Sequence, residues 1–537
     1  MSKLNGMQIF ELLSDLNDSL IVESVSPALL ASGAVAGLTG GAGVSSAGTV
    51  GATAAKGGFA AWLAKGGWIA LLAGVLVAAA VAVGVGIAGR DSAGTPSTGE
   101  DTVTESESLT EESAESTEGE TEAPLEESTE APTEETTDPA EEETYSQGLK
   151  FASNKDGTCY VSGLGDCTDT AVVIPPVSPA GDKVTGIGEM AFRNCADLVS
   201  VTIPEGVTSI GADAFSYCTG LAEVILPEGV ESIGDGAFAC CSGLGGVTIP
   251  DSVTSIGDMA FEACSGLTSI IIPDGVTVLH GSLFDGCTAL TEFTIPSGVT
   301  SIEREVFRGC TSLTSITIPA TVTSVDAYAF ADCTGLTSFM IPNTVTEMKD
   351  GVFSGCANLT IVKLPDGITR IPASMFEGCT ALTSFVIPDG VTSIGREAFK
   401  GCTGLTDVTI PPSATSMGDG VFAECTALTE INLPDGMTVI MDHLFEGCTS
   451  LTSVTIPAGV TRMGMNAFKG CTSLASVTIP ESVTRIGRYA FDGCADLTDV
   501  FYSGNRSQWE AIRFEDGEDI FLSATIHCSD GDLPVKD

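Results

Sequence analysis

The chain has 537 residues, of which 43% are hydrophobic, and a formal net charge of −49 at pH 7. Such an acidic excess excludes nucleic acid as the expected partner, because phosphates would be repelled, and is typical of a secreted or surface-exposed protein. The hydrophobic residues must then be concentrated in particular segments, and two segments supply them: a membrane helix and a repeat core.

The first 67 residues divide into two parts. Residues 1–25 predict a cytoplasmic amphipathic segment, because apolar residues recur there at helical spacing opposite acidic ones. A solvated helix without a partner is the alternative. Residues 26–67 are rich in alanine, glycine and serine, and we expect a flexible region.

A transmembrane helix is predicted at residues 68–89. Trp68 to Gly89 is an apolar run of 22 residues without a charge, which is long enough to span a bilayer core of about 30 Å. The run lies too far along the chain for a cleavable signal peptide. Lysines precede it and an acidic stretch follows it, so we expect a single-pass cell-membrane protein with a cytoplasmic N-terminus and extracellular repeats. Small residues four apart on this helix could pair two copies, although their frequency here also explains the spacing.

Residues 90–148 predict a disordered acidic stalk. Up to residue 148 this segment is rich in Asp, Glu, Ser, Thr and Pro and, after Arg90, has no lysine or arginine. Such a composition cannot bury enough apolar surface to fold, and its like charges keep it extended. A linker whose length has no particular role is the alternative.

Thirteen units of 23 residues follow without insertion at 198–496. Every unit begins with leucine, has aliphatic or aromatic residues at its fourth and sixth positions, and has proline at its seventh, where a strand must end. A fixed period of this length predicts an α/β-type repeat solenoid, in which each unit adds one short parallel strand and a tight turn or 3₁₀ segment. We expect an N-terminal cap at 149–197, a C-terminal cap at 497–528 and a polar tail at 529–537.

Two further columns predict the core of the solenoid. A phenylalanine and a cysteine recur every 23 residues and should form inward-facing ladders; their first, middle and last members include Phe215, Phe330, Phe491, Cys218, Cys333 and Cys494. The common orientation of the cysteines favours free thiols over disulfides. Off the ladder, a bridge between Cys159 and Cys167 is left open.

The repeated phrase L-T-S-V-T-I-P-(D/E)-G-V-T-S-I-G-x-x-A-F-x-G-C-T resembles the BspA-type leucine-rich repeat of bacterial surface proteins. The resemblance covers about 149–528, including the two caps. It implies a leucine-rich-repeat array, exposure on the cell surface and adhesion to host or neighbouring-cell macromolecules, without saying which ones.

A candidate ligand site lies on the exposed strand face, formed by the third and fifth residues of each unit. Most units have Ser or Thr at these positions, but the middle of the array departs from this with Ile271, Met340, Ile361, Lys363 and Val386. An apolar patch on a face lined with hydroxyls is a reasonable contact site. Neutral variation at positions that tolerate any strand residue is the alternative.

No enzyme, cofactor or metal site is predicted. His280, His443 and His527 are isolated in the sequence, and we find no zinc, EF-hand or hydrolase motif. Charge is uneven, because no Lys or Arg lies between Arg193 and Arg304. The half of the array nearer the stalk is therefore strongly acidic, and whether it binds cations is left open.

The predicted function is binding of an extracellular protein or glycan through the strand face, by a membrane-anchored surface protein. Two alternatives remain: a transmembrane sensor that signals to residues 1–25, and an architectural envelope protein without a saturable ligand. The ligand and the oligomeric state do not follow from the sequence.

Overall fold

The computed structural model describes residues 144–515 and 524–533. The predicted cytoplasmic segment, flexible region and transmembrane helix, and the stalk as far as residue 143, lie outside these residues. Within the described ranges, no helix combines the length and apolar character that crossing a membrane requires.

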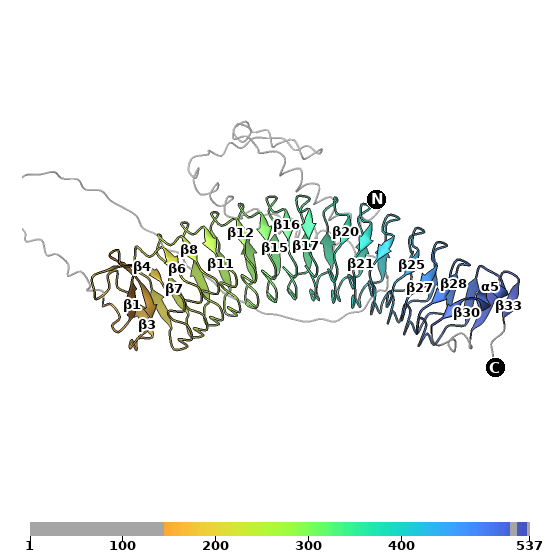
Figure 1. Ribbon diagram of the computed structural model, residues 1–537, viewed down its shortest axis with the longest axis horizontal. Helices are drawn as coiled ribbons and strands as arrows, with labels where there is room; N and C mark the ends of the chain where they lie inside the picture. Colours follow the sequence, from red (N-terminus) through yellow and green to blue (C-terminus); the bar gives the residue numbers. More distant parts are fainter. Residues whose placement is uncertain (1–143, 516–523, 534–537) are drawn as a thin grey trace, which may run out of the picture. The chain divides into compact units, whose positions relative to one another are not determined.

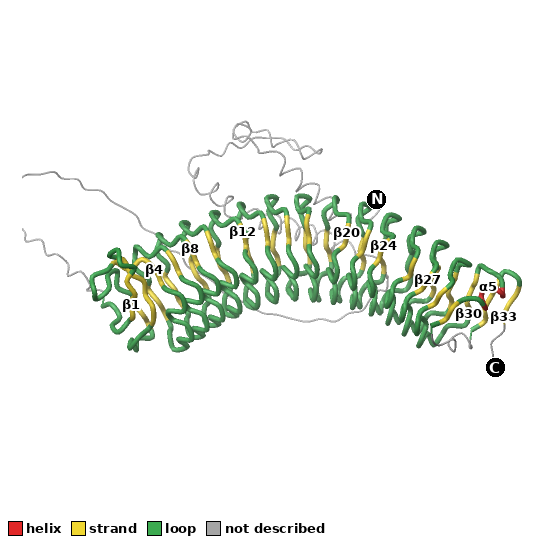
Figure 2. Tube along the Cα trace, viewed as in Figure 1, coloured by secondary structure: helices red, strands yellow, loops and turns green. Residues whose placement is uncertain are grey.

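Twelve of the thirteen repeats contribute two short strands, one to each of two rows of parallel strands that we call the first and second sheets, and the repeat at 428–450 contributes only the second strand (Figures 1 and 2). Hydrogen bonding divides each row into shorter sheets of two to six strands. The first-sheet strands are β5 (Ser200–Thr202), β7 (Glu223–Ile225), β9 (Gly246–Thr248), β11 (Ser269–Ile271), β13 (Glu292–Thr294), β15 (Ser315–Thr317), β17 (Ser338–Met340), β19 (Ile361–Lys363), β21 (Ser384–Val386), β23 (Asp407–Thr409), β26 (Ser453–Thr455) and β28 (Ser476–Ile479). The second-sheet strands are β6 (Ser209–Ile210), β8 (Ser232–Ile233), β10 (Ser255–Ile256), β12 (Val278–Leu279), β14 (Ser301–Ile302), β16 (Ser324–Val325), β18 (Glu347–Met348), β20 (Arg370–Ile371), β22 (Ser393–Ile394), β24 (Ser416–Met417), β25 (Val439–Ile440), β27 (Arg462–Met463) and β29 (Arg485–Ile486). Partners lie 23 residues apart, as with Phe339 and Val362.

The parallel solenoid with a 23-residue spacing is confirmed, and two details of the prediction are wrong. A repeat has two strands rather than one. The second strand was not predicted because a strand of two residues, such as β6, is too short to show a period in the sequence. The α/β character is also absent from the described residues, where the only helix is α5 (Arg506–Glu510) in the C-terminal cap.

The third side of each repeat consists of tight turns with left-handed residues at fixed positions. In the first repeat these are Asp213 (φ 54°) and Tyr217 (φ 62°). Backbone N–H groups of this side donate to the next repeat, as from Phe215 N to the Ala237 oxygen at 2.7 Å. Many later repeats have glycine at the second position, for example Gly378 (φ 74°), because glycine adopts this conformation without a Cβ penalty.

The core is a set of side-chain columns that run the length of the repeats. Consecutive rings of the phenylalanine column are stacked, with centroid separations from 5.1 Å (Phe192 and Phe215) to 6.0 Å (Phe330 and Phe353). Phe491, the last ring of this column within the repeats, is also buried. In the neighbouring column each thiol donates to the carbonyl of a phenylalanine 26 residues earlier, as Cys333 Sγ does to Phe307 O at 3.0 Å.

All eighteen cysteines are free thiols. The bridge between Cys159 and Cys167 that the sequence left open is not formed, and Cys159 Sγ instead donates to the Asp182 carbonyl at 3.6 Å. Cys218, Cys333 and Cys494 are buried members of the ladder.

The N-terminal cap begins earlier than its predicted start at residue 149. It consists of β1 (Lys150–Ser153), β2 (Thr158–Gly163), β3 (Ala171–Val173) and β4 (Lys183–Ile187), of which β3 and β4 continue the first and second sheets. Ser146 N donates to Val173 O at 2.9 Å, and the Ser146 hydroxyl accepts from Val173 N at 3.1 Å. The last residues of the predicted stalk therefore belong to the cap.

The C-terminal cap extends past its predicted end at residue 528. It contains β30 (Asp499–Tyr502), α5, β31 (Arg513–Phe514), β32 (Thr525–Cys528) and β33 (Gly531–Leu533). Because β33 pairs with β32 in antiparallel fashion, residues 531–533 of the predicted tail are part of the sheet. Trp509 of α5 is buried, with its ring edge-on to Tyr502 at 5.3 Å.

Candidate recognition surface on the strand face

The first sheet presents two side chains of each repeat to solvent. In β11, Ser269 and Ile271 are exposed and Ile270 between them is buried, as the alternation of a strand requires. The same exposed, buried, exposed pattern recurs in β7, β9, β13, β21, β23 and β26. The strand face is therefore defined by the third and fifth residues of the repeats.

Hydroxyl groups dominate this face and the backbone beside it. Threonine occupies the fifth position in seven of the thirteen repeats. Next to the strands, threonine side chains donate to the carbonyl of the equivalent threonine one repeat earlier, as Thr360 Oγ1 does to Thr337 O at 2.8 Å. A face of this kind offers hydroxyls at a regular spacing and little apolar area.

Four of the five predicted ligand-binding residues come together in three successive repeats. Met340 of β17 lies opposite Lys363 of β19 in the parallel register, and Ile361 lies opposite Ser338. Val386 of β21 occupies the same column one repeat further on. Ile361 and Val386 are 37% and 47% exposed, and Met340 and Lys363 are half-buried. We call Met340, Ile361, Lys363 and Val386 the strand-face patch.

The fifth predicted residue, Ile271, lies apart from the patch. It is 81% exposed, but two threonines, Thr294 and Thr317, separate it from Met340 in the same column. Ile225, which is 52% exposed at this position of β7, was not among the predicted residues. Reading the fifth position through all thirteen repeats would have found it.

The patch also carries an unusual charge for this face. Lys363 is the only lysine or arginine at a third or fifth position in the thirteen repeats, whereas Glu223, Glu292, Asp407 and Glu430 are acidic residues at third positions. A single cation beside three apolar side chains therefore distinguishes the patch from the remainder of the strand face.

The cysteine column has a structural role. Burial raises the pKa of the Cys310 and Cys356 thiols to about 12. These groups stay protonated at neutral pH, and thiolates are the form that attacks electrophiles and binds metals. The ladder cysteines consequently act as small buried hydrophobes that hydrogen-bond to the backbone.

One group of titratable side chains lies away from the strand face. Asp258, His280 and Glu303 come from three successive repeats, and one ligand atom of each lies within 4.8 Å of the others. His280 is isolated in the sequence, but in the structure its Nδ1 atom lies 3.3 Å from Glu303 Oε2.

The repeats match known proteins. The family model for the BspA type Leucine rich repeat region (6 copies) matches residues 185–314, 280–406 and 392–518. A leucine-rich repeat protein from Bacteroides ovatus ATCC 8483 is 28% identical, with a TM-score of 0.54 over 72% of this chain and 99% of that one. A leucine rich cell surface protein from Faecalibacterium prausnitzii A2-165 is 32% identical, with a TM-score of 0.46 over 70% of this chain and 98% of that one.

Functionally curated proteins gave no match to the chain. The family matches together span more than half of its residues, and they cover the repeats from the end of the N-terminal cap into the C-terminal cap. The chain belongs to the BspA type leucine-rich repeat family.

Proposed function

We propose that this protein recognises an extracellular protein or glycan through the strand-face patch. The observation that carries the proposal is the patch itself, in which Met340 and Ile361 lie beside Lys363 and Val386 follows in the same column one repeat further on. Apolar side chains that are held on a rigid sheet lose little conformational entropy on binding, and a neighbouring cation supplies orientation. The partner would present a small apolar group beside an acidic one.

The proposal includes attachment to the cell membrane through residues 68–89, with the repeats outside the cell. Support comes from the uncharged run of 22 apolar residues and from the 32% identity to a leucine rich cell surface protein from Faecalibacterium prausnitzii A2-165. The acidic residues 90–143 would then hold the repeats away from the bilayer, because like charges extend a chain.

Binding of the purified chain to immobilised matrix proteins, mucins and glycans tests this function. A Met340→Ser/Val386→Ser double variant should bind at least about tenfold more weakly than the parent, because an apolar anchor at the centre of a contact commonly contributes more than about 1.4 kcal/mol. Met190→Ser/Met465→Ser is the matched control, since both methionines are exposed outside the strand face. Saturable binding that the patch variant retains would contradict the proposed site. The absence of saturable binding would contradict recognition altogether.

A further inference from the structure

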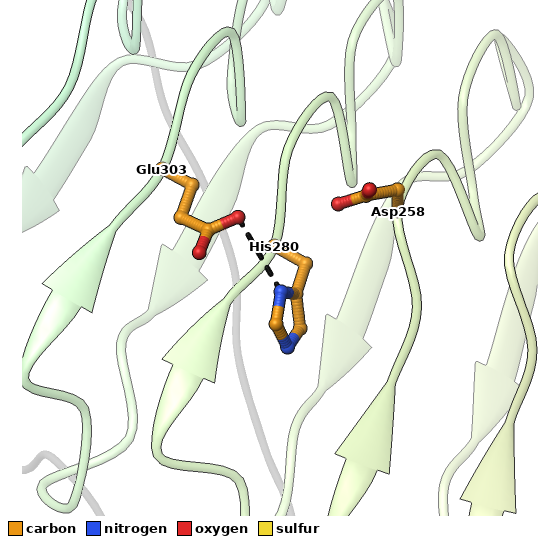
Figure 3. A group of neighbouring side chains, drawn as sticks. All are labelled: Asp258, His280 and Glu303. Carbon is orange, nitrogen blue, oxygen red and sulfur yellow. Dashed lines mark ion pairs between the residues drawn. The ribbon is translucent and has the colours of Figure 1, made fainter.

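We propose that Asp258, His280 and Glu303 form a binding site for a divalent transition-metal ion of the zinc class. The three side chains follow the ends of β10, β12 and β14 in the second sheet, on three neighbouring repeats (Figure 3). One potential ligand atom of each lies within 4.8 Å of the other two. Because successive parallel strands are about 4.8 Å apart, one ion could reach all three repeats.

His280 and Glu303 depart from the commonest residue at their position in the repeat. His280 and Glu303 directly follow the second strand, where seven of the thirteen repeats have glycine. The glycine has a steric reason: a Cβ on Gly257 would lie 2.1 Å from Asp235 Oδ1, and one on Gly395 would lie 2.4 Å from Ala373 N. Six repeats have a side chain at this position, and in three consecutive ones it is a possible metal ligand: His280, Glu303 and Asp326.

The two carboxylates are drawn together with little positive charge to balance them. A single backbone N–H, that of Gly281, donates to both Asp258 Oδ1 at 2.9 Å and Glu303 Oε2 at 3.1 Å. In the described part of the chain, no lysine or arginine forms an ion pair with either carboxylate. The nearest arginine in sequence, Arg304, instead pairs with Glu305 at 3.0 Å. A cation between the carboxylates would relieve their repulsion.

The ligand set selects the class of ion. Imidazole favours zinc and related transition metals, whereas calcium and magnesium prefer sites made only of oxygen. One imidazole and two carboxylates match the three protein ligands of an open zinc site, with water at the remaining position. The side chains of His280 and Glu303 are each 39% exposed, so water and metal can reach them. Coordination at about 2.0–2.2 Å requires the ligand atoms to close in by about 1 Å, which side-chain rotation allows.

Calorimetric titration of the purified full-length chain with ZnCl₂ tests the site. His280→Gly installs the residue that most repeats have here, and Glu303→Gln keeps the shape of the side chain while removing its charge. We expect each variant to lose one zinc equivalent, or to bind it at least tenfold more weakly. His443→Gly is the matched control, because it removes a half-exposed imidazole beside Glu446 at a position of φ 60° that suits glycine. It should retain the full zinc stoichiometry.

Other outcomes would overturn the proposal. Equal zinc binding by the parent and both site variants would place any bound zinc elsewhere, including at the partly exposed thiols. Loss of zinc in His443→Gly as well would show a non-specific effect. Saturable calcium binding that depends on Glu303 but not on His280 would assign the pair of carboxylates to a different ion. Far-UV circular dichroism of each variant separates loss of the site from loss of the fold. Failure of strand-face binding would leave this result unchanged, since the two sites use different residues.

Discussion

At the scale of single residues, the repeat makes any departure from the pattern easy to interpret. Ser216 is fully buried, and its hydroxyl has no hydrogen-bond partner. The equivalent residue one repeat later is Ala239, which occupies the same environment without a polar group. A buried unsatisfied hydroxyl destabilises the folded state, because it has lost its hydrogen bonds to water.

Ser216→Ala should therefore raise the free energy of unfolding by about 1 kcal/mol. Urea denaturation followed by circular dichroism measures the change. Ser354→Ala is the control, since Ser354 lies in the same column but is partly exposed, and it should change stability little. Lower stability in Ser216→Ala would mean that the hydroxyl has a favourable contact.

Phe330→Ala should lower the free energy of unfolding by about 3–5 kcal/mol. The ring is fully buried and lies between Phe307 at 5.4 Å and Phe353 at 6.0 Å, and Phe339 packs against it at 4.8 Å. The neighbouring rings belong to adjacent repeats, whose backbones are hydrogen-bonded together. The surrounding structure therefore cannot close the cavity that the missing ring would leave. The same denaturation experiment checks this. Ser338→Ala on the exposed face of that repeat should be neutral, and an unchanged midpoint for Phe330→Ala would refute the ladder.

The sequence predicted single residues well where the 23-residue period repeats and poorly where residues from different columns meet. Phe330 and Cys333 could be placed in the core because thirteen equivalents share their pattern. The grouping of Asp258 with His280 could not be read in this way, because the two are 22 residues apart and lie in adjacent columns. Only the turn geometry, in which Gly281 N reaches the Asp258 carboxylate, brings them together.

At the scale of elements, the C-terminal cap contains a charge cluster centred on a histidine. His527 of β32 lies between two carboxylates, with Nε2 2.8 Å from Asp499 Oδ1 and Nδ1 3.0 Å from Asp532 Oδ1. The ring also stacks on Phe501 at 4.8 Å. The hydrogen bond with Asp499, and then that with Asp532, raises the pKa of His527 above its ordinary 6.5. The hydrogen bond with His527 is the main cause that lowers the pKa of Asp499 below 3.8.

The two shifts define a window of maximal cap stability. Because the pKa of His527 is raised in the folded state, the contribution of His527 to the free energy of unfolding is complete below about pH 6.5. It is lost as the pH rises through the folded-state pKa. Because the folded pKa of Asp499 is lowered, its contribution is present above about pH 3.8 and is lost as the pH falls further. The cluster should therefore stabilise the cap most between about pH 4 and pH 6.5.

His527→Gln should destabilise the protein more at pH 5.5 than at pH 8.5. Urea midpoints of the parent and the variant, measured at both pH values, give the difference directly. His443→Gln removes an imidazole that is paired with Glu446 in a repeat turn, and it shows how much of the pH dependence is common to any paired histidine. A difference between the parent and His527→Gln that is the same at both pH values would contradict the charge cluster.

Strands of three residues were predictable, and strands of two were not. Positions four and six of the repeat are apolar, and proline ends the segment, so the sequence pattern marks the first strand. The second strand, such as Ser301–Ile302, has one buried residue beside one partly exposed residue, which any turn could also show. It pairs with residues 23 positions away, and no local pattern in the sequence specifies that pairing.

At the scale of the whole array, each repeat contacts mainly the repeat before it and the one after it. The strand pairs of both sheets and the turn hydrogen bonds all join residues that are close to 23 positions apart. Stability should then be close to a sum of similar repeat and interface contributions, as in other solenoids. Only the two caps, which close the ends of the core, are irreplaceable.

Removal of one complete repeat, residues 313–335, should leave a folded protein. The deletion joins Ser312 to Leu336, which restores the sequence register, so the far-UV spectrum should keep its shape and the denaturant m-value should fall by no more than about a tenth. Deletion of residues 313–324 is the matched control. It removes about half a repeat, including Ser324 of β16, and places the turn residues 327–329 where a first-sheet strand belongs, so the columns on either side of the junction lose register and cooperative unfolding should be lost. If the complete deletion were as damaging as the half deletion, the repeats would not be interchangeable, and stability would depend on contacts specific to residues 313–335.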